Sequence, residues 1–216
     1  MSQTLTQTEL DQGSNQQHPG PEIARGDSET GREDETEVFG FWAFMMSDAI
    51  IFTLLFATFG VLRQGLAGGP GPRELFSLPL TAAETAALLT SSVTFGVASL
   101  GLQAERPGRA IFWLAITFVL GAIFLGLELY EFHDIFSKGG TPQTSGFLSA
   151  WFTLLATHGL HVTFGMGWLI LIVVQLILYG TEAQVGQRML RLGIFWHFLD
   201  VVWVGIFSIV YLGTLA

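Results

Sequence analysis

The sequence predicts an all-α membrane protein, a polytopic bundle of five transmembrane helices. Half of the 216 residues are hydrophobic and only 12% are charged, and the mean hydropathy is +0.52. The apolar residues occur in long continuous blocks, without the period of a helix on the surface of a soluble protein. A block of about 20 residues, rising about 1.5 Å per residue, crosses a hydrocarbon core of about 30 Å. These features exclude a soluble globular fold.

An acidic segment precedes the first apolar block. Residues 1–38 contain nine acids and two arginines, a charge of −7 out of −9 for the whole chain. The segment has hardly any large apolar residue, so it cannot bury enough surface to offset the conformational entropy lost on ordering. We expect residues 1–37 to be a disordered cytoplasmic tail, followed by one transmembrane domain over residues 38–216.

Turn residues divide this domain into five blocks. The first covers about residues 39–62 and is followed by a loop rich in Gly and Pro. The second covers about 80–102, and the third covers about 109–130, before the Gly139-Gly140 pair. The fourth, about 147–178, is longer than a perpendicular crossing requires, so we expect it to tilt or to project beyond the lipid. The last covers about 192–215.

Basic residues in the short loops predict the orientation, because they are retained on the cytoplasmic side. With the N-terminus inside, six basic residues lie on the inner side and three on the outer side. The six are Arg25, Arg32, Arg106, Arg109, Arg188 and Arg191, and the three are Arg63, Arg73 and Lys138. We therefore predict a multi-pass protein of the bacterial cytoplasmic (inner) membrane, with a cytoplasmic N-terminus and a periplasmic C-terminus.

Ionisable side chains occur inside the apolar blocks, where an aspartate at the centre of a helix costs roughly 2.5–3.5 kcal/mol. Such groups are expected to face a neighbouring helix or a polar cavity, so the last helix must have a partner. Depth along the helices predicts an inner polar layer in the cytoplasmic half, made of Asp48, His158, His161, His197 and Asp200. Depth also predicts three outer carboxylates far from this layer, Glu84, Glu128 and Glu131, and the last two are expected at a helix end in interfacial water.

Each inner residue has a structural interpretation beside a functional one. His158 and His161 are more often hydrogen-bonded to helix carbonyls or to each other than ligands. Asp48 lies in a stripe of phenylalanines, where it is either a structural carboxyl kept neutral or a group that exchanges protons or contacts lipid. The residues leave both possibilities open. Gly159, Thr163 and Gly167 recur every four residues, which indicates a face that a neighbouring helix approaches closely.

Enzymatic motifs are lacking in the sequence. There is no cysteine, no Glu-x-x-His pair of the di-metal bundles and no His-Glu-x-x-His motif. We therefore predict no catalytic residue and no metal or cofactor site in this chain. The alternative is a membrane enzyme or transporter with its own histidine and carboxylate site. The lack of broken helices in matching halves argues against a transporter.

Several segments resemble subunit III of the haem-copper terminal oxidases. ATHGLHVTFG (156–165) and FWHFLDVVW (195–203) resemble the paired signature of that family, and MSDAIIF (46–52) resembles its first shared helix. FGFWAFMMSD (39–48), ETAALLTSSVTFG (84–96), GLELYEFHDIF (126–136) and SGFLSAWFTLL (145–155) are similar to the quinol oxidase branch, of the bacterial cytochrome o (bo-type) kind. The resemblance extends from about residue 38 to the C-terminus.

This resemblance implies a non-catalytic membrane subunit of a proton-pumping terminal quinol oxidase in the aerobic respiratory chain. Such a subunit supports assembly, stability and proton uptake of the catalytic subunit I, which carries the haem and copper. It also implies a V-shaped bundle that binds phospholipid, in a five-helix form, and no nucleic acid partner. Many members carry a reactive glutamate where this chain has Asp48, whose carboxyl is one methylene shorter. The electron donor and the haem type are set by other subunits.

Overall fold

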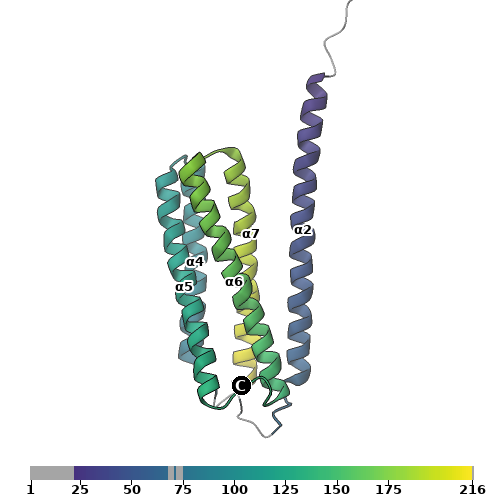
Figure 1. The fold of residues 1–216 in the computed structure, drawn as a ribbon, viewed down its shortest axis with the longest axis vertical. Coiled ribbons are helices and arrows are strands. Elements are labelled where there is room, and N and C mark those ends of the chain that lie inside the picture. The colour runs from purple at the N-terminus through teal and green to yellow at the C-terminus, as the bar shows by residue number, and fades with distance from the viewer. Residues whose placement is uncertain (1–21, 68–70, 72–74, 216) are drawn as a thin grey trace, which may run out of the picture. The chain divides into compact units, whose positions relative to one another are not determined.

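The computed structural model describes residues 22–67, 71 and 75–215, and within them the side chains of residues 39–67, 71 and 75–214. The regular elements in this part of the chain are helices, and five of them are long and apolar enough to cross a membrane. They are α2 (Glu22–Leu62), α4 (Leu78–Gln103), α5 (Pro107–Ser137), α6 (Gly146–Tyr179) and α7 (Ala183–Ile206), and α7 continues into η1 (Phe207–Leu212) and α8 (Gly213–Leu215) (Figure 1). The predicted all-α class and the five spans are therefore confirmed.

The chain forms two compact units, residues 1–46 and residues 47–216, and each is described by itself. In the first unit, α2 begins at Glu22, within the segment predicted to be a disordered tail, and the tail stays a prediction. Extending an existing helix adds a hydrogen bond for each residue fixed and avoids the cost of nucleation. Residues 1–21, the rest of the predicted tail, lie outside the described residues.

In the second unit, α4, α5, α6 and α7 form a four-membered ring. Helix α4 contacts α5 and α7, and α6 contacts the same two helices (Figure 1). Small residues allow this packing, since apolar burial gives little driving force between helices in lipid. A Cβ atom added at Gly121 or at Gly165 would lie 3.3–3.4 Å from the ring of Trp196. The indole of α7 thus fills the space that glycines leave on α5 and α6.

The part of α2 within the second unit is attached to the ring by phenylalanines. Phe52 lies 6.2 Å from Phe198 of α7, and Phe59 lies 5.9 Å from Phe147 of α6, measured between ring centroids. Phe52 and Phe59 are buried, whereas Ile50 and Leu54, two residues on either side of Phe52, are exposed. The residue spacing therefore gives this part of α2 one face that packs against α6 and α7 and another face that is exposed on the surface of the chain.

Helix ends match the turn chemistry of the sequence with two corrections. As predicted, α6 covers the fourth block, and its Ser145 side chain accepts a hydrogen bond from the Leu148 amide at 3.2 Å. Helix α5 continues to Ser137, beyond the predicted end at about residue 130, because the first residue that favours a stop is Gly139, with φ of +80°. Helix α7 begins at Ala183, nine residues before the predicted start, so the polar segment at 183–191 is also helical.

Candidate functional site

Asp48 of α2 and His161 of α6 form a pair. Asp48 is 5% exposed, and its Oδ2 atom lies 3.6 Å from Nε2 of His161. The Nδ1 atom of His161 lies 2.7 Å from the carbonyl oxygen of Thr157, which can only accept, so Nδ1 carries a hydrogen and donates it. In the neutral imidazole, Nε2 is then an unprotonated acceptor that faces the carboxyl. The Asp48 carboxyl and the unprotonated nitrogen of His161 therefore face each other between α2 and α6.

His158 has a different environment from His161, although the two lie one turn apart. Its ring is fully buried, and neither ring nitrogen has a hydrogen-bond partner among the described residues. The rings of Phe52, Phe124 and Trp203 lie 6.2, 5.8 and 5.3 Å from it, measured between centroids. Of the two predicted structural histidines, His161 thus has the carbonyl bond expected of it. His158 lacks such a bond among the described residues, and its environment is aromatic.

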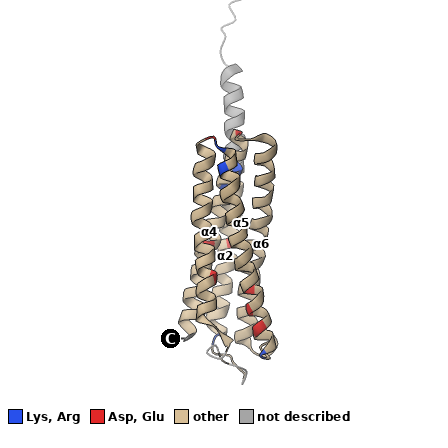
Figure 2. Cartoon of the chain, turned by 90° about the vertical axis from the view of Figure 1, so that its left-hand side faces the viewer, with Lys and Arg blue, Asp and Glu red and all other residues tan. Residues whose placement is uncertain are grey.

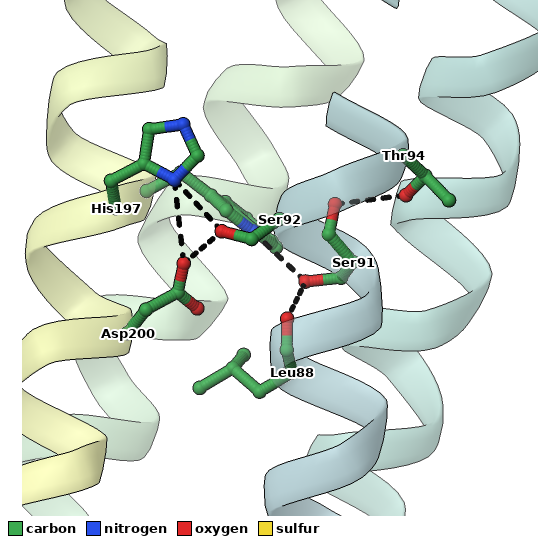
Figure 3. A network of polar contacts seen from close by, with 7 residues as sticks. Leu88, Ser91, Ser92, Thr94, His197 and Asp200 are labelled. Carbon is green, nitrogen blue, oxygen red and sulfur yellow. Dashed lines mark hydrogen bonds and ion pairs between the residues drawn. The ribbon is translucent and has the colours of Figure 1, made fainter. Parts of the chain in front are cut away.

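A second polar group joins α7 to α4 (Figure 3). The hydroxyl of Ser92 lies 2.8 Å from Nδ1 of His197 and donates to Oδ2 of Asp200, and the latter oxygen lies 3.5 Å from the same Nδ1. The predicted partner of the last helix is therefore α4. Ser92 was not predicted, although the hydroxyl-rich segment TSSVT (90–94) within an apolar span was an available signal.

The Ser92, His197 and Asp200 group lacks the geometry of a nucleophilic triad. In such a triad the acid binds one imidazole nitrogen and the other nitrogen takes the proton of the serine. Here the serine and the aspartate lie on the same nitrogen, and Figure 3 shows the second nitrogen pointing away from both. The His197 side chain is 54% exposed. The arrangement fits a hydrogen-bonded helix contact rather than an acyl-transfer site.

Further hydroxyl groups on α4 extend the contact with α7. The indole nitrogen of Trp196 donates to the Ser91 hydroxyl, and that of Trp203 donates to the Thr85 hydroxyl, each at 3.0 Å. Both serine and threonine hydroxyls also donate to carbonyls of their own helix. Each hydroxyl therefore satisfies an indole of α7 while its own hydrogen remains bonded within α4.

The structure separates the predicted inner polar layer into two groups. Within the described residues, no hydrogen bond or ion pair joins Asp48 or His161 to His197 or Asp200. The two groups meet through an aromatic contact. The ring of Phe52 lies 5.1 Å from the ring of His161 and also contacts the ring of Phe198, which is the residue after His197. The common depth of the five residues stays a prediction.

The three outer carboxylates are not in interfacial water. Glu84 is fully buried, and Glu128 and Glu131 are each 2% exposed. The prediction is wrong because α5 continues past Tyr130 and keeps Glu128 and Glu131 on its inward face, whereas His133 is exposed. Nor does Glu128 lie far from the histidines. A Cβ added at Gly159, the residue after His158, would lie 2.6 Å from the Oε2 atom of Glu128.

The stripe of small residues on α6 has a mixed outcome. Gly159 is buried against the Glu128 carboxyl of α5, and its role in helix packing stays a prediction. Thr163 is exposed and bonds the carbonyl of Gly159 within its own helix at 2.8 Å. Nothing described in this chain lies within 4 Å of a Cβ built at Gly167, so the packing prediction is wrong there within the chain. The closer contact is at Gly165, against Phe195 and Trp196.

A metal centre has no ligand set among the described residues, since no group of three or more His, Cys, Asp or Glu side chains is placed to hold an ion. His158 has free nitrogens, but its ring neighbours are aromatic, and the Asp48–His161 pair supplies two groups at most. What the arrangement can do chemically is hold and exchange protons and fix the helices to one another.

The sequence matches the profile of the cytochrome c oxidase subunit III family over residues 34–214. It is 47% identical over 175 residues to cytochrome bo(3) ubiquinol oxidase subunit 3 of Pseudomonas aeruginosa, which covers 81% of this chain and 84% of the relative. It is 42% identical over 176 residues to the protein of the same name from Buchnera aphidicola, covering 82% and 91%. It is 42% identical over 185 residues to quinol oxidase subunit 3 of Bacillus subtilis, covering 86% and 89%.

The profile match extends over all five membrane-spanning helices and both polar groups. It covers residues 34–214, and the relatives named above are 42–47% identical over more than four fifths of the chain. The chain therefore belongs to the cytochrome c oxidase subunit III family.

Proposed function

We propose that the chain is the non-catalytic third subunit of a proton-pumping terminal quinol oxidase. The observation that carries this proposal is the similarity, at 40–47% identity over more than four fifths of the chain, to proteins named as subunit 3 of quinol oxidases. The polar groups of the described residues connect helices, which supports a structural role of this kind. Electron transfer from quinol to oxygen would then take place in another subunit.

The partner we propose is the catalytic subunit I, with its haem and copper, together with membrane phospholipid. The apolar surface of the helices supports a partner of this kind. In each span, between 22% and 50% of the most apolar stretch is buried inside this chain. At least half of each stretch is therefore available for contact with lipid or other subunits. Large apolar side chains such as Phe164, Leu171 and Ile177 lie exposed along α6.

The orientation we propose puts the N-terminus in the cytoplasm and the C-terminus in the periplasm of a bacterial inner membrane. The helix bounds support this assignment, since Arg106, Arg109, Arg188 and Arg191 lie at or near the α4–α5 and α6–α7 connections. Figure 2 shows the Lys and Arg of the described residues near the ends of the helices, while Asp and Glu also occur along their length. Retention of arginines on the cytoplasmic side then selects the orientation.

A role in proton uptake is proposed for the Asp48–His161 pair. The carboxyl is 5% exposed and faces an imidazole nitrogen at 3.6 Å, which is too long for a direct hydrogen bond but within reach of an ion pair. A proton taken up by one partner is stabilised by the other, because the Thr157 carbonyl fixes the imidazole orientation.

A tagged chain purified from detergent-solubilised membrane tests the proposed function. We expect a larger subunit to accompany it, with the optical spectrum of a haem protein, and quinol-dependent oxygen consumption by the purified material. Removing the tag from this chain and placing it on the larger subunit should recover the same complex. Purification of the chain without any haem protein, in a mild detergent that preserves other respiratory complexes, would refute the proposal.

A further inference from the structure

Three carboxyl groups are buried together inside the second unit, away from the two polar groups described above. Glu84 belongs to α4, Glu128 and Glu131 belong to α5, and Tyr211 of η1 lies beside them. The exposed fractions are 0%, 2%, 2% and 0%. The carboxyl of Glu84 interacts electrostatically with those of Glu131 and Glu128, and Tyr211 interacts with all three. We call these four residues the carboxyl cluster.

The hydrogen bonds of the carboxyl cluster are incomplete. The Tyr211 hydroxyl donates to Oε2 of Glu131 at 2.6 Å. Both oxygens of Glu84, Oε1 of Glu128 and Oε1 of Glu131 have no partner among the described residues. Buried polar atoms are rarely left unpaired in proteins, and an ordered water molecule commonly completes them. Four carboxyl oxygens without partners therefore indicate that water occupies the cluster.

His158 provides an independent observation beside the cluster. Its two ring nitrogens are buried and unpartnered, and it precedes Gly159, on which the Glu128 carboxyl lies. The ring of Phe124, one helical turn before Glu128, lies 5.8 Å from the His158 ring. A polar side chain with two free nitrogens and no exposed surface thus lies next to the same space. An imidazole with two free nitrogens is itself a hydrogen-bond partner for water.

Charge limits how the three carboxyls can be ionised. Three buried carboxylates would repel one another, and the loss of hydration is unfavourable for each of them. The charged groups near Glu131 are Asp134 and Lys138, but Lys138 is bound to Asp134 at 2.6 Å, and both lie at the exposed end of α5. No cation among the described residues is paired with the cluster, so protons must neutralise it.

The hydrogen-bond partners assign these protons. Of the three carboxyls, Glu131 alone receives a hydrogen bond from a side chain among the described residues, the Tyr211 hydroxyl at 2.6 Å, and such a bond favours the charged form of the carboxyl. Glu131 is therefore the group that bears the negative charge. Glu84 and Glu128 receive no hydrogen bond that would stabilise an anion, and as neutral acids each can donate to a bound water.

We propose that Glu84, Glu128, Glu131 and Tyr211 form a buried site that binds water and holds two protons, on Glu84 and Glu128, around one carboxylate on Glu131. The ligand class is water together with exchangeable protons. The proposal concerns this chain alone and does not depend on the subunits with which it assembles.

Infrared spectroscopy of the chain, purified together with its accompanying subunits, tests this site. Protonated carboxyls absorb separately from carboxylates, and glutamate labelled with ¹³C at the carboxyl assigns the bands to glutamate. We expect Glu84→Gln and Glu128→Gln each to lose one protonated-carboxyl band relative to the native protein. Glu131→Gln should lose none, because that group is ionised. Tyr211→Phe removes the donor to Glu131 and should add a band, since the third carboxyl then takes up a proton.

Asp134→Asn is the matched control, because this carboxyl is on the same helix but is exposed and paired with Lys138. It should leave the protonated-carboxyl region unchanged. Transfer of the native protein into D₂O should shift the bands of Glu84 and Glu128, because water reaches them. Unchanged spectra for both Glu84→Gln and Glu128→Gln, in protein with native helical content, would overturn the proton assignment. Bands that never shift in D₂O would overturn the binding of water.

Discussion

Gly159 and Gly167 lie on the same helix, and the structure predicts different effects of replacing them with alanine. A Cβ at Gly159 would lie 2.6 and 2.9 Å from the two carboxyl oxygens of Glu128, closer than real Cβ contacts. These oxygens are the far end of a flexible side chain, so the carboxyl can shift, and the cost is at the low end of the usual range for overpacking, about 1 kcal/mol. At Gly167 nothing lies within 4 Å, and alanine gains about 0.5–1 kcal/mol of helix propensity over glycine.

The propensity gain is common to both variants, so their difference isolates the clash at about 1 kcal/mol. For a chain of this size, about 1 kcal/mol shifts Tm by roughly 2–4 °C, which gives a Tm about 2–4 °C lower for Gly159→Ala than for Gly167→Ala. The assay is thermal unfolding of the purified protein in detergent, with the amount of chain in the membrane as a second measurement. Equal Tm values for the two variants would show that the Glu128 carboxyl does not lie against Gly159.

Other predictions concern the proton pair, the contact between α4 and α7, and the topology. Asp48→Asn retains shape but cannot titrate, so an oxidase containing it is expected to lose turnover mainly at alkaline pH with normal assembly; equal rates at all pH values would make Asp48 structural. Thr85→Val leaves the Trp203 indole hydrogen unpaired and should cost about 1–3 kcal/mol in thermal unfolding, whereas Thr90→Val at an exposed position should cost little. A reporter active only in the cytoplasm should work in the 103–108 loop and fail at Ala216; the reverse result would invert the orientation.

The sequence by itself determined the fold class and the number of spans. Apolar blocks of sufficient length in lipid can form only helices, because each backbone polar group must be satisfied within its own segment. Local turn chemistry also determined the start of α6, where Ser145 accepts from the Leu148 amide. The deeply placed Asp200 required a partner helix, and this requirement followed from the cost of an ionisable group in an apolar segment.

Only the tertiary structure decided which residues meet. Asp200 accepts from Ser92, which is 108 residues away in sequence, and Glu131 accepts from Tyr211, which is 80 residues away. Periodicity predicts which residues share a face of one helix, but the rotation and register of two helices are set by side-chain packing across the contact. The burial of Glu128 against Gly159 likewise depends on how closely α5 approaches α6. Such contacts arise from shape complementarity between segments distant in sequence, for which a single sequence has no local signal.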